Sequence, residues 1–474
     1  MRQLLLVFVV CFLVYSCGED TTSNSSTSIS GEIVNSNESF ITLEKDGEFV
    51  DSVALSENGS FSYNFDENNF ESGLYTFRHK PEGQTFFIEK GDSLLLRVNT
   101  KEFDESLMFT GNKAEENNFL IEMYLLNEKD NDLILSYYKV SPEKFAKKTD
   151  SIRSLRLDQL ENLEDKYEFS ESFLSLAEKN IDYEYYDLRE RYSYLINKYF
   201  NEFRNKIPKE FFSYRKQVNF NDKDLQSLYT YQRFLDNYLK NRAIERCVAE
   251  NPNKECFDTE SITNLKNRLI LSDSIFKIEN LRNRFISRFA KRQLNSAKNE
   301  QQIDSSLQLV KSFDFPKDQY EELKQIGKLQ KNYFVGKNTS NAKLYTTTGE
   351  KIILKDILDK QTITFTWSLY INNHPKFHKR VNELRNRYPE INFLGVNIDS
   401  DDKETYDLWL KALSNFDYNK DFEVKIRDRG NEIYLYKNFL NKILLIDENG
   451  IIKKSNLNLF DPNFEAELLE YLNQ

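Results

Sequence analysis

The chain has 474 residues, which is enough for two to four domains. Its formal net charge is −11, and no stretch combines clustered Lys and Arg with aromatic residues. Because phosphate contacts need clustered cations, this composition excludes a typical nucleic-acid-binding protein. After the first residues, no apolar run is long enough to cross a bilayer as a helix.

Residues 1–16 have the layout of an export signal. Arg2 precedes an apolar run at residues 4–15, which is shorter than the ~20 residues of a membrane-spanning helix. The run ends in Val14-Tyr15-Ser16-Cys17, which resembles a lipobox, in which the cysteine sulfur receives a diacylglycerol. We therefore predict lipidation at Cys17; an ordinary cleaved signal with an incidental cysteine is the alternative.

The segment that follows is expected to be a flexible tether. Residues 17–27 contain acidic residues and then Ser, Thr and Asn, which cannot bury apolar surface. Acidic residues at this place resemble the tags that send some Gram-negative lipoproteins to the outer membrane. We predict a cell-envelope protein held at the outer membrane by the lipid on Cys17, with the periplasmic and the surface face both left open.

Two of the four cysteines lie beyond the expected leader. Cys247 and Cys256 flank a segment whose Asn251-Pro252-Asn253 is typical of a turn. In an oxidising compartment, two cysteines that close a short turn favour a structural disulfide. They are too far apart in sequence for a redox Cys-x-x-Cys motif, so a catalytic role is the lesser alternative.

Residues 28–112 alternate apolar and polar side chains in short runs, as strands with one buried face do. The runs at residues 53–55 and 61–65 flank Asn58-Gly59 and predict a hairpin. A second predicted hairpin joins residues 86–88 to residues 94–98 through Lys90-Gly91-Asp92. We expect a small antiparallel β-sandwich domain here.

Residues 115–330 have few Gly, many Lys and Glu, and apolar residues at helical spacing, which predicts a helical region. One apolar stripe consists of Tyr192, Leu195, Ile196, Tyr199 and Phe203. Such stripes are typical of packing between helices; a surface that contacts sugar or peptide is the alternative.

From residue 334 onward, predicted strands alternate with helices. A hairpin turns at Gly349, a strand at residues 363–367 leads into a helix, and a strand at residues 393–398 leads into another. Two short strands and a final helix, which begins at Asp461-Pro462, complete the order β-α-β-α-β-β-α. This is the thioredoxin arrangement, so the whole chain is expected to be a multidomain α+β protein.

Residues 334–474 resemble the TlpA-type thioredoxin-like domains of bacterial cell envelopes. The segments that carry the resemblance are Val335-Gly336-Lys337, Gly395-Val396-Asn397-Ile398-Asp399 and Leu444-Leu445-Ile446-Asp447-Glu448-Asn449-Gly450. Residues 28–112 are similar to the β-sandwich of unknown function that often precedes such domains in lipoproteins.

The residues of the family's redox site are missing. In this family a strand tryptophan precedes Trp-Cys-x-x-Cys, and a cis-proline faces that motif. Aligning Trp367 with the strand tryptophan places Ile371 and His374 at the two cysteine positions and Asn441 at the proline. Thiol exchange needs a thiolate and a second thiol, and a non-proline cis bond costs ~3 kcal/mol. The resemblance thus implies a thioredoxin-like fold with a trans peptide before Asn441, without redox catalysis, catalytic residues or a cofactor.

The sequence was also searched for residues that could bind a metal ion or a phosphate group or act as a nucleophile. His374 and His378 are four residues apart on the first helix, a spacing that lets two imidazoles meet one metal ion. No third ligand is evident, so we predict no metal site. His79 is alone in the predicted sandwich and is expected to be structural or exposed. The sequence contains no glycine-rich phosphate loop and nothing that resembles a nucleophile elbow.

The favoured function is non-catalytic binding of a peptide, a protein or another envelope ligand in the groove beside the first helix. The expected groove contacts are Trp367, Tyr370, Asn372, Asn373, His374, Asn441 and Lys442. The alternative is a periplasmic thiol-disulfide oxidoreductase of the TlpA type, which would need Cys247, Cys256 or a partner's thiols at the groove. Metal carriage through His374 and His378 is a third hypothesis, and the sequence leaves the oligomeric state open.

Overall fold

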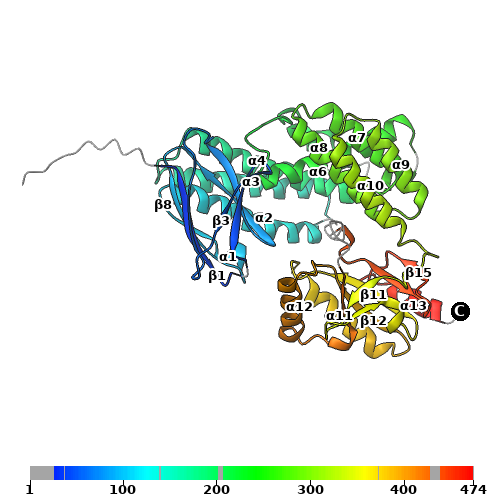
Figure 1. Cartoon of the computed structure of the whole chain (residues 1–474). Coiled ribbons are helices and arrows are strands. Elements are labelled where there is room, and N and C mark those ends of the chain that lie inside the picture. The colour runs from blue at the N-terminus through cyan, green and yellow to red at the C-terminus, as the bar shows by residue number, and fades with distance from the viewer. Residues whose placement is uncertain are drawn as a thin grey trace, which may run out of the picture.

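The structure is a computed structural model that describes residues 26–36, 38–137, 140–200, 206–252, 254–371, 373–427 and 438–472. The expected signal, Cys17 and most of the tether lie outside these residues. Figure 1 shows three parts: an N-terminal part of two sheets, a helical part, and a thioredoxin-like part that contains the C-terminal sheet. The division into separately folding domains stays a prediction. Within the described residues, no helix is both long and apolar enough to cross a membrane.

The N-terminal part contains two four-stranded sheets. The first sheet has the order β4-β1-β7-β8 and the second the order β3-β2-β5-β6. The strands of the first sheet are β1 (Ser28–Val34), β4 (Ser60–Asn64), β7 (Ser93–Asn99) and β8 (Met108–Gly111). Those of the second are β2 (Phe40–Lys45), β3 (Glu48–Ala54), β5 (Gly73–His79) and β6 (Glu82–Ile88), and the short helix α1 (Phe103–Ser106) follows β7. Alternate residues from both sheets, such as Ile29 and Phe77, meet in one apolar core.

Both predicted hairpins in this part are wrong. Strand β3 pairs with β2, whereas β4 pairs with β1, so the turn at Asn58-Gly59 crosses from one sheet to the other. In the same way, β6 pairs with β5 and β7 pairs with β1, on either side of Gly91. Alternation identifies the side of a strand that faces the core. It does not identify the partner strand, because both sheets bury their residues in the same core.

Two neighbouring asparagines at the start of α2 (Ala114–Tyr137) seal the edges of both sheets. The Asn117 side chain accepts a hydrogen bond from Phe87 N (2.7 Å) and donates one to Phe87 O (2.9 Å), on edge strand β6. The Asn118 side chain does the same with Phe109 N (2.9 Å) and Phe109 O (3.0 Å), on edge strand β8. Each amide thus replaces a pairing strand at an otherwise open edge.

We expect Asn117→Ala to lower the free energy of unfolding by about 1–3 kcal/mol, because it leaves the backbone groups of buried Phe87 without partners. Asn118→Ala should cost less, because Asn118 is only half-buried. Urea titrations followed by circular dichroism measure both effects, with exposed Glu122→Ala on the same helix as the control. Equal midpoints for Asn117→Ala and the control would contradict this role.

The helical part follows α2. Its α-helices are α3 (Pro142–Glu164), α4 (Glu171–Tyr199), α6 (Tyr229–Glu250), α7 (Ile262–Ile275), α8 (Glu279–Ser296), α9 (Glu300–Lys311) and α10 (Lys317–Lys331). The 3-10 segments η1 (Lys209–Lys216) and η2 (Lys254–Phe257) lie between them. Within the predicted apolar stripe, Tyr192 and Ile196 are buried in helix packing, whereas Tyr199 is 60% exposed. Phe203 lies outside the described residues.

The predicted disulfide between Cys247 and Cys256 is present. Cys247 lies in the last turn of α6 and Cys256 in η2, and both sulfur-bearing residues are buried. Asn264 on α7 donates a side-chain hydrogen bond to Cys256 O at 3.1 Å, which holds this turn against the next helix. The bond therefore joins structural elements of the helical part.

The thioredoxin-like part is built on one seven-stranded sheet with the order β10-β9-β13-β12-β11-β14-β15. Its strands are β9 (Lys343–Tyr345), β10 (Lys351–Ile353), β11 (Thr362–Trp367), β12 (Asn392–Asn397), β13 (Glu423–Ile426), β14 (Ile443–Ile446) and β15 (Ile452–Ser455). Its helical segments are α11 (His374–Arg387), α12 (Lys403–Asn415), α13 (Phe464–Leu472), η3 (Leu354–Ile357) and η4 (Lys420–Phe422). Strands β11, β12 and β13 are parallel, and β14 is antiparallel to β11. The thioredoxin-like fold is therefore present, with β13 as a strand that the sequence did not predict.

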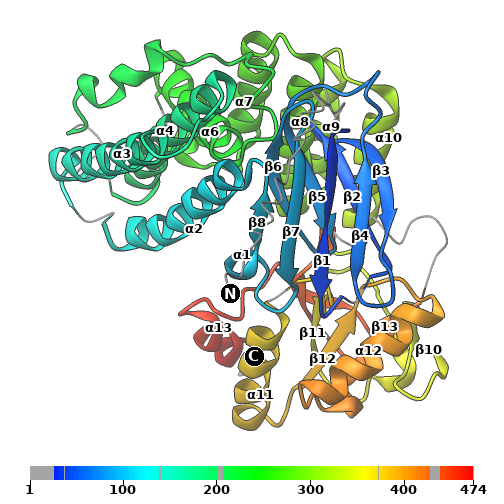
Figure 2. The same ribbon diagram turned by 90° about the vertical axis from the view of Figure 1, so that its left-hand side faces the viewer.

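One apolar cluster connects the three parts. It begins in the N-terminal sheets at Phe87, whose ring lies 5.6 Å from that of Phe173 on α4. It continues through the helices to Tyr333 after α10, whose ring lies 5.2 Å from that of Phe439 just before β14. Figure 2 shows the N-terminal strands standing above the C-terminal sheet, with one end of the strands directed toward it. This packing holds loops from the N-terminal part against the thioredoxin-like part.

Candidate functional site

A cavity of about 650 Å³ lies at the carboxyl ends of β11 and β12. In parallel sheets this end of the strands is the usual place for ligands, because the connecting loops diverge there. The thioredoxin-like part lines the cavity with Ser368, Tyr370, Ile371, Ile398, Asp399, Ser400, Asp402, Glu404, Thr405, Leu408 and Leu440. The N-terminal part closes it with Glu38, from the β1–β2 loop, and with Lys80 and Pro81, from the β5–β6 turn. The site therefore combines loops that are about 300 residues apart in sequence.

Asp399 fixes the loop that stands where the redox motif would be. Its carboxylate accepts hydrogen bonds from Ser368 Oγ, from Leu369 N (2.8 Å) and from Asn397 Nδ2 (2.8 Å). Lys425 on β13 donates to Asn397 Oδ1 at 2.6 Å, and burial lowers the pKa of this lysine to about 8. A chain of buried polar contacts thus connects the loop after β11 to β12 and β13 and stabilises it.

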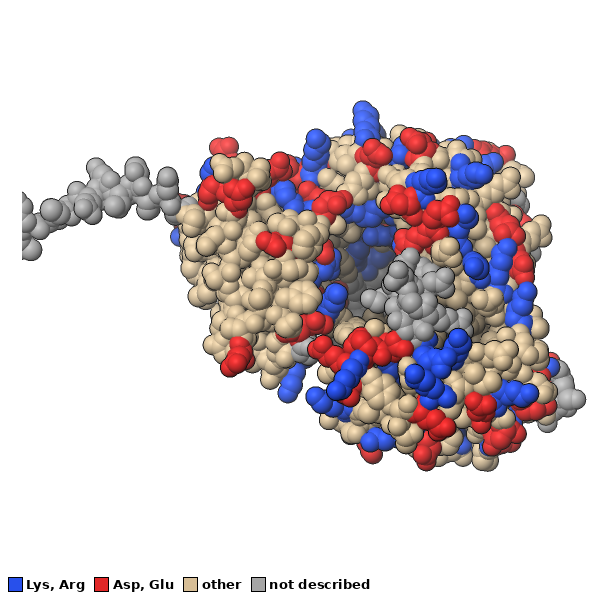
Figure 3. All heavy atoms as spheres, in the orientation of Figure 1, with Lys and Arg blue, Asp and Glu red and all other residues tan. Residues whose placement is uncertain are grey.

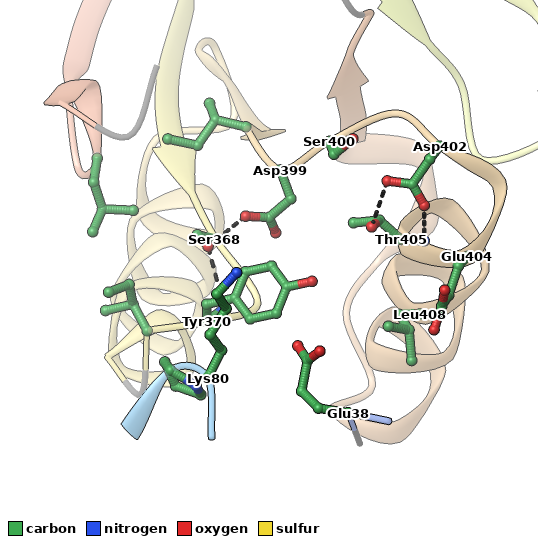
Figure 4. Close-up of a pocket in the computed structure, with 14 residues that line it drawn as sticks. Glu38, Lys80, Ser368, Tyr370, Asp399, Ser400, Asp402, Glu404, Thr405 and Leu408 are labelled. Carbon is green, nitrogen blue, oxygen red and sulfur yellow. Dashed lines mark hydrogen bonds between the residues drawn. The ribbon is translucent and has the colours of Figure 1, made fainter. Parts of the chain in front are cut away.

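Tyr370 projects from this loop into the cavity. Figure 4 shows its hydroxyl directed toward the interior, with Asp399 on one side of the ring and Glu38 on the other. Burial raises the pKa of the Tyr370 phenol, a hydrogen bond with Thr405 lowers it, and the nearby carboxylates raise it further. The phenol therefore stays protonated at neutral pH and can donate or accept a hydrogen bond.

Three of the predicted groove residues point away from the cavity. Trp367 is 1% exposed, His374 is 6% exposed, and Lys442 is 8% exposed. Trp367 and His374 pack among aromatic rings under the start of α11. Lys442 Nζ donates to Gln330 Oε1 on α10 (3.0 Å) and to Asn456 Oδ1 (2.9 Å), so it ties the helical part to the sheet. These three side chains serve packing and are not part of the cavity wall.

The other predicted positions are closer to the cavity. Tyr370 and Ile371 line it, and Asn373 is the N-cap residue of α11 without a capping side-chain hydrogen bond. Asn441, at the proline position, follows a trans peptide bond as expected and has φ of 60°, a conformation that asparagine tolerates better than most residues. Its neighbour Leu440 lines the cavity in its place. Asn372 lies outside the described residues.

A buried carboxyl group lies between a tryptophan and a histidine of the thioredoxin-like part. Glu423 on β13 accepts a hydrogen bond from Trp367 Nε1 (2.9 Å), and its second oxygen lies 3.3 Å from His378 Nε2. His378 Nδ1 lies 2.7 Å from the carbonyl oxygen of His374, so Nδ1 carries the proton that this bond requires. The contact between Nε2 and Glu423 therefore needs a second proton. Because burial raises the pKa of Glu423, its carboxyl group is well suited to hold it.

Gly395 makes room for this carboxyl group. A Cβ atom at position 395 would lie 2.3 Å from both carboxylate oxygens of Glu423, so any other residue on β12 would displace the carboxyl group. Sequence comparison with the family assigned Gly395 to the central strand, and the structure supplies the physical reason for glycine there.

We expect Glu423→Gln to keep the free energy of unfolding within about 1 kcal/mol of the wild type, because the amide can accept from Trp367 Nε1 and donate to His378 Nε2. Glu423→Leu leaves both groups without partners and should cost about 1–3 kcal/mol for each. Urea unfolding followed by tryptophan fluorescence measures the difference, with exposed Glu390→Leu as the control. A Gln variant as unstable as the Leu variant would show that the site requires a charged carboxylate.

The two histidines of the first helix have different polar partners. Their rings are 6.2 Å apart, and His374 Nδ1 lies 2.7 Å from the Tyr418 hydroxyl. Among the described residues, no group of three or more His, Cys, Asp or Glu side chains could hold a metal ion. His79 is buried in the N-terminal part, where its Nε2 lies 2.7 Å from Ser36 Oγ.

Sequence reasoning missed most of the cavity wall. Asp399 could have been found, because an aspartate directly after a parallel strand lies at the ligand-binding edge of the sheet. Glu404 and Leu408 follow from the position of α12 at the same edge. Glu38 and Lys80 carry no local signal, since only the packing of the N-terminal part against the C-terminal sheet brings them to the cavity.

Comparison with known proteins found similarity among solved structures. No protein-family model matches the sequence, and no curated protein is significantly similar to it. Similar solved structures include the thioredoxin domain of a thiol-disulfide oxidoreductase from Bacteroides vulgatus, with 15% identity over 29% of this chain and 98% of that one, and a TM-score of 0.24.

Two further structures match a similar share of this chain. One is a thiol-disulfide oxidoreductase from Bacteroides fragilis, with 16% identity over 29% of this chain and 99% of that one, and a TM-score of 0.23. The other is a domain of a possible thiol-disulfide isomerase from Cytophaga hutchinsonii, with 24% identity over 30% of this chain and 94% of that one, and a TM-score of 0.24. The assignment of the fold rests on the strand order and the helix positions.

Proposed function

We propose that this chain is an envelope lipoprotein that binds an extended segment of a peptide or protein, without thiol exchange, in the cavity between its N-terminal sheets and its thioredoxin-like part. The observation that carries the proposal is the cavity itself. It lies at the carboxyl ends of β11 and β12, beside the start of α11, where Ile371 replaces the first cysteine of the redox motif.

The size and the lining of the cavity support a peptide ligand. A volume of about 650 Å³ is within the range of pockets that take drug-sized molecules, which a few peptide residues match in size. The wall combines apolar Pro81, Leu408 and Leu440 with polar Tyr370, Ser400 and Thr405. This combination suits a chain segment that presents both side chains and backbone amide groups.

The positions of the sulfur atoms argue against the oxidoreductase alternative. Cys247 and Cys256 are bonded to each other between α6 and α7, and neither lines the cavity. A redox reaction at the cavity would therefore need thiols from another molecule. In this proposal the lipid on Cys17 serves only to hold the binding site at the membrane, outside the cytoplasm.

We expect Tyr370→Ala to weaken binding at least tenfold, because the phenol stands at the centre of the cavity wall. The probes are peptides enriched from a random heptapeptide phage library on the full-length protein in detergent, with affinities measured by calorimetry. Tyr199→Ala, an exposed tyrosine on α4, is the matched control. Enriched peptides that bind the Tyr370 variant as tightly as the wild type would refute this location for the site.

A test of thiol exchange separates the two candidate functions. Insulin reduction by dithiothreitol should proceed at the same rate with and without this protein, because no described thiol reaches the cavity. Acceleration comparable with that of a working dithiol protein, abolished by Cys247→Ser, would overturn the proposal in favour of the oxidoreductase.

A further inference from the structure

The carboxylates around the cavity differ in their hydrogen-bond partners. Asp399 is occupied by the loop that holds Tyr370, and Asp402 caps α12 through the backbone N and the hydroxyl of Thr405, both at 2.9 Å. In the part of the chain that the structure describes, no hydrogen-bond donor contacts the side chains of Glu38 and Glu404. The cavity therefore offers two free carboxylates, one from the N-terminal part and one from α12.

The charge of Glu404 acts on Glu38 across the cavity. Burial raises the pKa of the Glu38 carboxyl, Lys80 lowers it, and the negative charge of Glu404 raises it again. Like charges held near each other by a folded scaffold are destabilising, and a positive charge placed between them removes that repulsion. Figure 3 shows acidic side chains along the lower edge of the hollow between the parts of the molecule, and Lys and Arg side chains deeper inside it.

The remaining wall suits a long aliphatic stem with a charged end. Ile371, Leu408 and Leu440 provide apolar surface, and Tyr370 lines the same cavity. An aromatic face attracts an ammonium or guanidinium group within about 6 Å of its centroid. Lys and Arg side chains bury their methylene groups on such surfaces while the charged group stays with polar partners.

A cation of this chain already occupies part of the space. Figure 4 shows the Lys80 side chain extending from the β5–β6 turn into the cavity beside Tyr370. The described residues contain no ion pair between Lys80 and a carboxylate, and Lys80 is exposed. Its side chain is therefore free to withdraw when another cation enters.

From these contacts we infer that the ligand presents a Lys or Arg side chain to the cavity, with its charged group between Glu38 and Glu404 and its stem against Tyr370 and Leu408. The inference rests on the proposed function and deepens it by naming the ligand's charge. It also gives the N-terminal part a role, because its Glu38 selects for positive charge at a site on the thioredoxin-like part, while its Lys80 competes with the ligand's cation.

The test uses end-blocked tripeptides, Ala-Lys-Ala and its norleucine counterpart, titrated against the full-length protein in detergent by saturation-transfer NMR. The lysine peptide should bind at least tenfold more tightly. Glu38→Gln combined with Glu404→Gln should remove that advantage and leave the norleucine peptide unchanged, whereas Lys80→Ala should strengthen lysine binding. Glu57→Gln combined with Glu164→Gln changes the net charge equally at exposed sites away from the cavity and is the control.

The outcomes separate the inference from the function on which it rests. Equal affinities for the two tripeptides, or equal losses in the cavity pair and the control pair, would overturn the inference and leave peptide binding intact. If neither tripeptide binds and the heptapeptide library yields no ligand, the proposed function itself fails. A lysine advantage that is lost only in the cavity pair supports both.

Discussion

The cavity exists because one apolar cluster holds the N-terminal sheets against the thioredoxin-like part. Phe87 belongs to a strand of the N-terminal part, and Phe439 precedes a strand of the C-terminal sheet, yet both pack into the same core through the helices between them. If this core opened, Glu38 and Lys80 would leave the cavity and a shallow surface at the ends of β11 and β12 would remain. The helical part thus sets the geometry of a site to which its own helices contribute no wall residue.

The sequence predicted the thioredoxin-like order of elements because its central strands β11, β12 and β14 are rich in apolar and β-branched residues. The strand β13 was missed for the opposite reason: Glu423 and Lys425 are charged, and both are buried. Their burial is tolerated because Glu423 meets Trp367 and His378, and Lys425 meets Asn397. Such partners come from β11, α11 and β12 and cannot be read from the local pattern. A prediction based on hydrophobic periodicity therefore misses a buried strand whose charged residues have buried partners.

The candidate site was predictable to a smaller extent. Alignment with the family located the loop with Tyr370 and Ile371, and it identified the absence of sulfur correctly from the residues themselves. It did not show that His374 and Lys442 face the interior, since side-chain direction depends on where α11 begins and on the contact of Lys442 with Gln330. The contribution of the N-terminal part lay beyond any local signal, because it depends on the packing of segments that are far apart in sequence.

Replacement of the two cysteines changes what the end of this sheet can do. A redox loop must let a sulfur atom reach its partner and then be resolved, which requires an accessible thiolate. Here Asp399 binds the loop at Ser368 and Leu369, and the His374 side chain is buried under the helix start. These buried polar contacts hold the loop that carries Tyr370, whose backbone N donates a hydrogen bond to Ser368 Oγ. A side chain that is held in place by the scaffold loses little conformational entropy on binding, which supports the proposal that a ligand is bound at Tyr370.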